Sequence, residues 1–100
     1  MNIETLNIIE NEPMVHISII QRNRRQCITT IEGLDTINKD EKFLDKIVKK
    51  FKKEFNCGVS RKKENDIEIF KIQGDRRKDI KDFLIRNELI KEENIKIHGF

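Results

Sequence analysis

A polar stretch near the start of the chain concentrates positive charge without an acidic residue to neutralise it. Its members are Arg22, Asn23, Arg24, Arg25 and Gln26. A guanidinium group offers several N–H donors in a fixed plane, which matches the oxygens of phosphates and carboxylates. The residue types and their spacing therefore predict a contact with an anionic partner.

Two β-branched runs flank this stretch and predict two antiparallel strands, with the arginines at the tip of the hairpin. In the first run Val15 and two isoleucines alternate with polar residues, as expected of a strand with one buried face. In the second run Ile28 and Ile31 differ in parity. This difference leaves open a β-bulge or a strand that is covered on both faces.

Three segments of the chain resemble segments of one known family. Residues 15–34 read VHISIIQRNRRQCITTIEGL, residues 72–84 read IQGDRRKDIKDFL, and residues 95–100 read IKIHGF. These segments are similar to the translation initiation factor 1 family, which carries a SUI-type domain of the eukaryotic kind, and they occur in the family's order at family-like spacing. The resemblance covers residues 15–100 as one RNA- and ribosome-binding domain and leaves residues 1–14 as a short flexible tail.

Apolar periodicity predicts two helices after the hairpin. Asn38 and Glu41 have the spacing of a capping box, and the helix behind them ends near residues 56–58. One side of this helix is apolar and the others are rich in lysine; the lysines we select as candidates are Lys46, Lys50 and Lys53. Such a face is usually only solvated, but beside an arginine cluster it becomes a second candidate for phosphate contacts.

Further strands complete the predicted fold. Residues 58–61 and 67–73 predict a second strand pair joined by a polar loop, and we expect the second of these strands to lie inside the sheet with both faces covered. Gly74 allows a sharp turn, Asp75 is placed to cap the second helix, and residues 95–97 predict a last strand. The order β-β-α-β-β-α-β predicts an α/β fold of the α+β two-layer sandwich type, with about five strands in a mixed sheet and two helices on one face.

Length and composition fit one small domain. The 100 residues are 36% hydrophobic and 39% charged, which predicts a lean core beneath a charged surface, and the net charge is +3. Basic residues gather at the hairpin tip, along the first helix and at residues 61–63. No apolar run approaches the roughly 18 residues of a membrane-spanning helix and no leader opens the chain. We therefore expect a cytoplasmic monomer without a membrane partner.

The sequence lacks the motifs of common enzymes and metal sites. It has no Walker-type loop, no H-E-x-x-H and only two histidines, so we expect no catalytic residue, cofactor or metal. Cys27 and Cys57 stand far apart, which predicts two reduced, partly buried thiols, with a disulfide or metal site as the alternative. Because the chain has six Phe but no Trp or Tyr, phosphate contacts rather than base stacking would carry RNA binding.

The resemblance implies a function. It implies a non-enzymatic translation initiation factor that binds the small ribosomal subunit and its rRNA near the P site, alongside other initiation factors, and promotes scanning and start-codon selection. It adds Gly74, Asp75, Arg76 and Arg77 to the candidate ribosome-binding residues. It also marks Asp75 and Gly99 as sensitive positions for start-codon fidelity, with a plain helix cap and a plain strand end as the alternatives.

Other functions stay open at this point. The chain could be a related RNA-binding domain that acts in reinitiation or recycling, a basic protein-interaction module, or a small enzyme acting on phosphorylated substrates. Arg24 also departs from the family, which usually has Gly there, and Gln26 and Arg76 replace a usual Lys and Gln. Without that glycine an Asn-Gly type I′ turn is not possible, so the tip must bend in another way or place Arg24 in a strained conformation.

Overall fold

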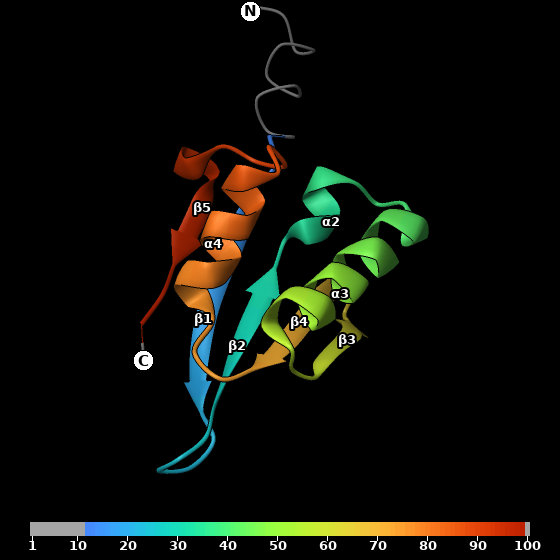
Figure 1. The fold of residues 1–100 in the computed structure, drawn as a ribbon. Coiled ribbons are helices and arrows are strands. Elements are labelled where there is room, and N and C mark those ends of the chain that lie inside the picture. The colour runs from blue at the N-terminus through green and yellow to red at the C-terminus, as the bar shows by residue number, and fades with distance from the viewer. Residues whose placement is uncertain (1–11, 100) are drawn as a thin grey trace, which may run out of the picture.

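A mixed five-stranded sheet carries all of the longer helices on one face (Figure 1). The computed structural model describes residues 12–99. The strands are β1 (Val15–Gln21), β2 (Cys27–Glu32), β3 (Val59–Glu64), β4 (Ile67–Gln73) and β5 (Ile95–Ile97), and the helices are α2 (Leu34–Ile37), α3 (Glu41–Phe55), α4 (Arg77–Arg86) and the 3-10 turn η1 (Glu92–Asn94). The predicted two-layer α+β fold is confirmed. None of the helices within residues 12–99 is long and apolar enough to cross a membrane.

The sheet order is β3-β4-β2-β1-β5, and only the β1–β5 pair is parallel. The β1–β2 register runs without interruption from the His16–Glu32 pair to the Gln21–Cys27 pair, so there is no bulge. Ile28 pairs with Ile20 on the sheet face away from the helices, whereas Ile31 is fully buried on the helix side. The parity difference therefore places these two isoleucines on opposite faces.

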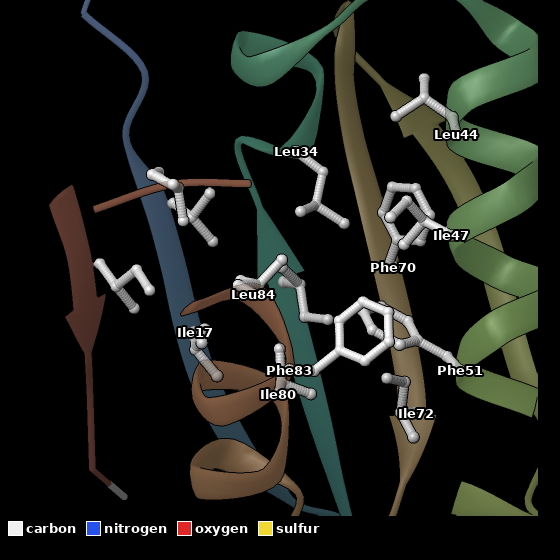
Figure 2. Close-up of a cluster of buried hydrophobic side chains, with 14 residues drawn as sticks. Ile17, Leu34, Leu44, Ile47, Phe51, Phe70, Ile72, Ile80, Phe83 and Leu84 are labelled. Carbon is white, nitrogen blue, oxygen red and sulfur yellow. The ribbon is translucent and has the colours of Figure 1, made fainter. Parts of the chain in front are cut away.

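One continuous core fills the space between the sheet and the helices (Figure 2). The apolar stripe of α3 supplies Phe51, which packs edge-to-face on Phe83 of α4 with the ring centroids 5.0 Å apart. The strands supply fully buried residues, namely Val15, Ile17, Ile31, Phe70 and Ile72. The other sheet face is open, since Ile20 is 53% exposed and Ile67 is 47% exposed. The prediction that the strand at residues 67–73 is covered on both faces is therefore wrong.

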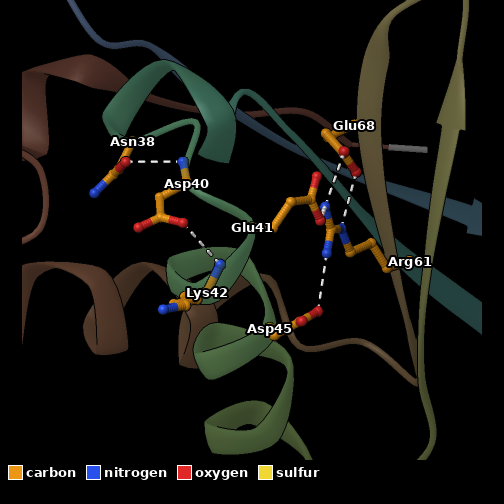
Figure 3. Close-up of polar contacts among 7 residues, drawn as sticks. All are labelled: Asn38, Asp40, Glu41, Lys42, Asp45, Arg61 and Glu68. Carbon is orange, nitrogen blue, oxygen red and sulfur yellow. Dashed lines mark hydrogen bonds and ion pairs between the residues drawn. The ribbon is translucent and has the colours of Figure 1, made fainter.

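The helix cap and the second hairpin also differ from the prediction. Asp40, not Asn38, caps α3, because its carboxylate accepts a hydrogen bond from the Lys42 backbone N–H at 3.1 Å. The Asn38 side chain instead accepts from the backbone N–H of Asp40 (Figure 3). The loop between β3 and β4 is shorter than predicted: Asn65 and Asp66 both have positive φ (49° and 65°), as in a two-residue type I′ turn.

The chain segment before β1 is fastened to the domain. The backbone N–H of Met14 donates to Thr36 Oγ1, and the Glu12 carboxylate accepts from the Asn94 side chain. Gly33 passes so close to Met14 that a Cβ there would lie 2.0 Å from the Met14 carbonyl oxygen. The rest of the predicted tail, residues 1–11, lies outside the described residues, and the domain boundary after residue 14 stays a prediction.

Candidate nucleic-acid interface

The hairpin tip bends through a side chain instead of a glycine. All five tip residues, 22–26, are exposed, and none has a positive φ. The Asn23 carbonyl Oδ1 accepts hydrogen bonds from the backbone N–H groups of Arg25 and Gln26, each at 2.9 Å. The Gln26 carbonyl accepts from the N–H of Arg22 at 2.9 Å. Arg24 therefore needs no strained conformation, and the tip presents three exposed guanidinium side chains on an ordered turn.

The turn after β4 is fastened to the root of the same hairpin. The backbone N–H of Gly74 donates to the Cys27 carbonyl at 2.9 Å. The buried hydroxyl of Thr29 donates to the Gly74 carbonyl at 2.7 Å and accepts from the N–H of Arg76 at 2.8 Å. Sequence reasoning missed Thr29, whose only signal is a small polar residue at a core-facing position of β2. Through Thr29 the hairpin and the residue 74–77 segment are held as one unit.

Asp75 makes only part of the predicted cap of α4, because its carboxylate accepts a hydrogen bond from one backbone N–H of the first turn, that of Arg77. The N-cap position is Arg76, which has no side-chain cap. Asp75 also holds the Arg77 guanidinium through two shorter hydrogen bonds of 3.0 and 2.9 Å, whereas its bond from the Arg77 backbone N–H is 3.4 Å long. The hydrogen bonds from Arg77 lower the pKa of Asp75 and raise the pKa of Arg77.

Arg77 extends this unit to the end of the described chain. Its Nη1 donates to the His98 carbonyl at 3.3 Å, and a Cβ on Gly99 would lie 4.0 Å from the same nitrogen. The His98 backbone N–H donates to the Ile17 carbonyl on β1 at 2.8 Å. The structure therefore brings together the three separate segments, the hairpin root, residues 74–77 and Gly99.

Arg76 has a different setting from the tip arginines. Its guanidinium carbon lies 5.8 Å from the centre of the Phe55 ring, and its Nη1 lies 3.6 Å from the Asp79 carboxylate. Its Nε is buried and has no hydrogen-bond partner among residues 12–99. With 35% of its side chain exposed, Arg76 joins α3 to α4 and has only part of its charge available to a partner.

The candidate lysines of α3 lie on the helix layer, whereas the tip extends beyond the end of the sheet (Figure 1). Lys46, Lys50 and Lys53 are exposed. The first two line a cavity of about 130 Å³ together with Phe83 and Asn87 of α4. The structure thus does not bring these lysines next to the arginine tip.

Comparison with known proteins identifies the family of this chain. The family model described as translation initiation factor SUI1 matches residues 11–91. The chain belongs to the SUI1 family of translation initiation factors. Two SUI1 homologues of Arabidopsis thaliana are each 42% identical to it over 87 residues, which cover 86% of this chain and 74% of theirs. A SUI1 homologue of Salix bakko is 41% identical over the same coverage.

A solved structure gives the same fold at lower sequence identity. The SUI1-family chain matches the crystal structure of the C-terminal domain of human eIF2D with a TM-score of 0.68 and 15% identity. The match covers 83% of this chain and 41% of that chain. At this identity the likeness shows the shared fold alone.

The basic cluster at residues 61–63 of this SUI1 domain is partly neutralised. Arg61 donates two hydrogen bonds of 3.0 Å to the buried Glu68 carboxylate and also pairs with Asp45 and Glu41 of α3 (Figure 3). The hydrogen bonds raise the pKa of Arg61 and lower the pKa of Glu68. Arg61 therefore ties β3 and β4 to α3 and is not a candidate for RNA contact.

The two cysteines of the SUI1 domain are free thiols. Cys27 and Cys57 are both half-buried and unbridged, as predicted. Cys27 lies at the root of the hairpin, where its carbonyl accepts from Gly74. Cys27 therefore connects the hairpin root to Gly74 through its backbone carbonyl and not through its thiol.

Proposed function

We propose that this SUI1-family protein is a non-enzymatic factor that binds the small ribosomal subunit near the site of the initiator tRNA. The observation that carries this proposal is the exposed arginine tip, residues 22–26, which forms an ordered turn on a hairpin whose root is hydrogen-bonded to residues 74–76. Exposed cations on such a turn suit the phosphates of folded rRNA. The protein acts in the cytoplasm as a monomer, together with other factors of the preinitiation complex.

In the proposed mechanism the domain occupies part of the site that the initiator tRNA needs. The tip holds rRNA phosphates and the domain stands where a fully seated initiator tRNA would go, so scanning continues until correct codon pairing displaces it. Gly74, Asp75, Arg76, Arg77 and Gly99 tune this displacement, because they join the hairpin root to the chain end. Lys46, Lys50 and Lys53 add a second, weaker contact from the helix layer.

The direct test replaces two tip arginines, Arg24→Glu and Arg25→Glu. Both residues are exposed, so the free energy of unfolding should change by no more than about 0.5 kcal/mol per site. Binding to purified small subunits should weaken, and the salt slope of binding should fall by about one unit for each lost phosphate contact. Premature release should increase initiation at near-cognate codons in a reconstituted assay.

A control with the same charge change is Lys39→Glu with Lys91→Glu. Both lysines are exposed. Lys39 belongs to the connection between α2 and α3 and Lys91 to the connection between α4 and η1, and both connections lie toward the end of the molecule opposite the hairpin tip (Figure 1). This control should bind with nearly wild-type affinity and salt slope. Equal binding by the control and the tip variant, with start-codon choice unchanged in both, would rule out the hairpin as the ribosome-facing element.

A further inference from the structure

A groove lies at the root of the hairpin, on the sheet face that the helices leave open. We call it the root groove; its lining includes Ile20, Arg22, Ile28, Ser60, Lys71 and Gln73. Its volume is about 490 Å³, within the range of about 300–1,000 Å³ that is typical of sites for small molecules. The root groove shares Arg22 with the tip turn and includes no residue of the 74–77 segment described above.

The sheet register explains the shape of the root groove. Ile20 pairs with Ile28 across β1 and β2, and Ile28 pairs with Gln73 across β2 and β4, so these three side chains lie in one row on the open face. Lys71 pairs with Ser60 in the next row. The result is an apolar floor next to an amide, a hydroxyl and a cation.

The charged residues that line the root groove, Arg22 and Lys71, are both basic. Within the described chain no acidic residue is among those that line it. Neither Arg22 nor Lys71 is part of an ion pair within residues 12–99. Arg22 also belongs to the hairpin tip, so the groove is continuous with the proposed phosphate-binding surface.

We propose that the root groove holds one unpaired nucleotide of the RNA that the hairpin tip binds. The phosphates on the two sides of this nucleotide pair with Arg22 and Lys71, which flank the Ile20–Ile28–Gln73 row on opposite sides. The base lies over Ile20 and Ile28, and the Gln73 amide bonds a base edge. Proteins read RNA chiefly at bases that are splayed out of a helix. This inference rests on the proposed function, because it assumes that the tip binds RNA.

An acidic peptide with apolar side chains would match the same two cations, but the continuity with the tip favours RNA. A nucleotide bound here would be adjacent to the phosphates held by residues 22–26. A peptide would gain nothing from the tip arginines unless it was acidic along its whole length. The two occupants can be distinguished by RNA binding to the purified protein, because only a nucleotide site predicts a preference for RNA with an unpaired base.

The test compares two RNA hairpins with the same stem, one fully paired and one with a single bulged uridine. At one salt concentration the wild-type protein should bind the bulged RNA about five- to tenfold more tightly, which is the lower end of the range for a base stacked on an aromatic ring, because the floor here is aliphatic. Ile20→Gln should remove this preference and keep the affinity for the paired RNA. Ile20 is 53% exposed, so an unchanged melting temperature would show that the variant is folded.

A matched control is Ile67→Gln. Ile67 is 47% exposed on the same sheet face but does not line the root groove, so this variant should keep the preference for the bulged RNA. Equal affinity of the wild-type protein for the two RNAs, or a preference that survives in Ile20→Gln, would overturn the inference. So would NMR shifts at Ile28 and Gln73 caused by a Leu- and Glu-rich peptide and not by the bulged RNA. These outcomes leave the small-subunit binding test of the tip variant unaffected.

Discussion

Two uncharged side chains, those of Asn23 and Thr29, hold turns of this domain by accepting hydrogen bonds from backbone N–H groups. The amide oxygen of Asn23 accepts two backbone N–H groups and so reverses the chain at the tip without a glycine. The Thr29 hydroxyl accepts the Arg76 N–H, which lies at a helix start that has no cap of its own. Each of these residues places charged neighbours, although neither is charged itself.

Glu68 is a buried charged residue that is paired with Arg61. Its side chain is only 7% exposed and holds Arg61 through two hydrogen bonds. Glu68→Gln should lower the free energy of unfolding at pH 7 by about 1.5–3 kcal/mol, the range for hydrogen bonds to charged groups. Arg61 keeps Glu41 and Asp45 as partners, so a complete loss of folding is not expected.

The same carboxylate should make stability depend on pH. Arg61 lowers the pKa of Glu68 below the value of about 4.3 for an unfolded chain. Its contribution is therefore complete above that value and is lost as pH falls through the folded pKa. In urea denaturation at several pH values, wild type and Glu68→Gln should differ most at pH 7 and converge in acid. Glu64→Gln, at an exposed carboxylate, serves as the control; two parallel curves for wild type and Glu68→Gln would contradict this account.

The turn between β2 and α2 leaves no room for a side chain at Gly33. Gly33 has φ +99° and lies against the Met14 backbone, whereas Gly58 has no atom within 4 Å of an added Cβ. Gly33→Ala should therefore lower the free energy of unfolding by more than about 1 kcal/mol. Gly58→Ala should change it by no more than about 0.5 kcal/mol. Urea denaturation of both variants tests the difference, and equal losses would argue against the close contact.

Elements with a long apolar period were predictable from the sequence. The stripe of α3 and the alternation of β1 specify buried faces, because each depends on many residues. The caps were not predictable, since Asn38 and Asp40 are both good acceptors near the same helix start and only the backbone path decides between them. The open face of β4 was also missed, because Ile67 and Ile69 make that face as apolar in sequence as the buried face with Phe70 and Ile72.

The candidate site was predictable only in part. The tip arginines and residues 74–77 are visible in the sequence as charge and as family segments. Their connection through Thr29 could not be predicted, because a single threonine in a strand does not indicate which distant backbone groups its hydroxyl will bind. The assignment of Asp75 was incomplete, since its carboxylate binds the Arg77 guanidinium as well as the Arg77 backbone N–H.

At the scale of the whole molecule, the helix layer and the hairpin tip are separate surfaces. Replacing Lys46, Lys50 and Lys53 with Gln should weaken small-subunit binding less than the tip variant does, while the circular dichroism stays helical. The salt slope should also fall, because each phosphate contact contributes about one unit. A matched control on the same helix is Lys42, Lys49 and Lys52 to Gln, which removes equal charge from other exposed positions. If both triple variants have the wild-type slope, the lysine face is only solvated.

The Asn23 turn has a consequence for how such a protein diverges. Because no tip residue has a positive φ, position 24 accepts any L-residue that the partner tolerates, while position 23 is held by its two hydrogen bonds. Natural selection can therefore raise or lower the charge of the tip by single substitutions at position 24 without a matching loss of folding. Affinity for the anionic partner and stability of the fold are then inherited as separate traits.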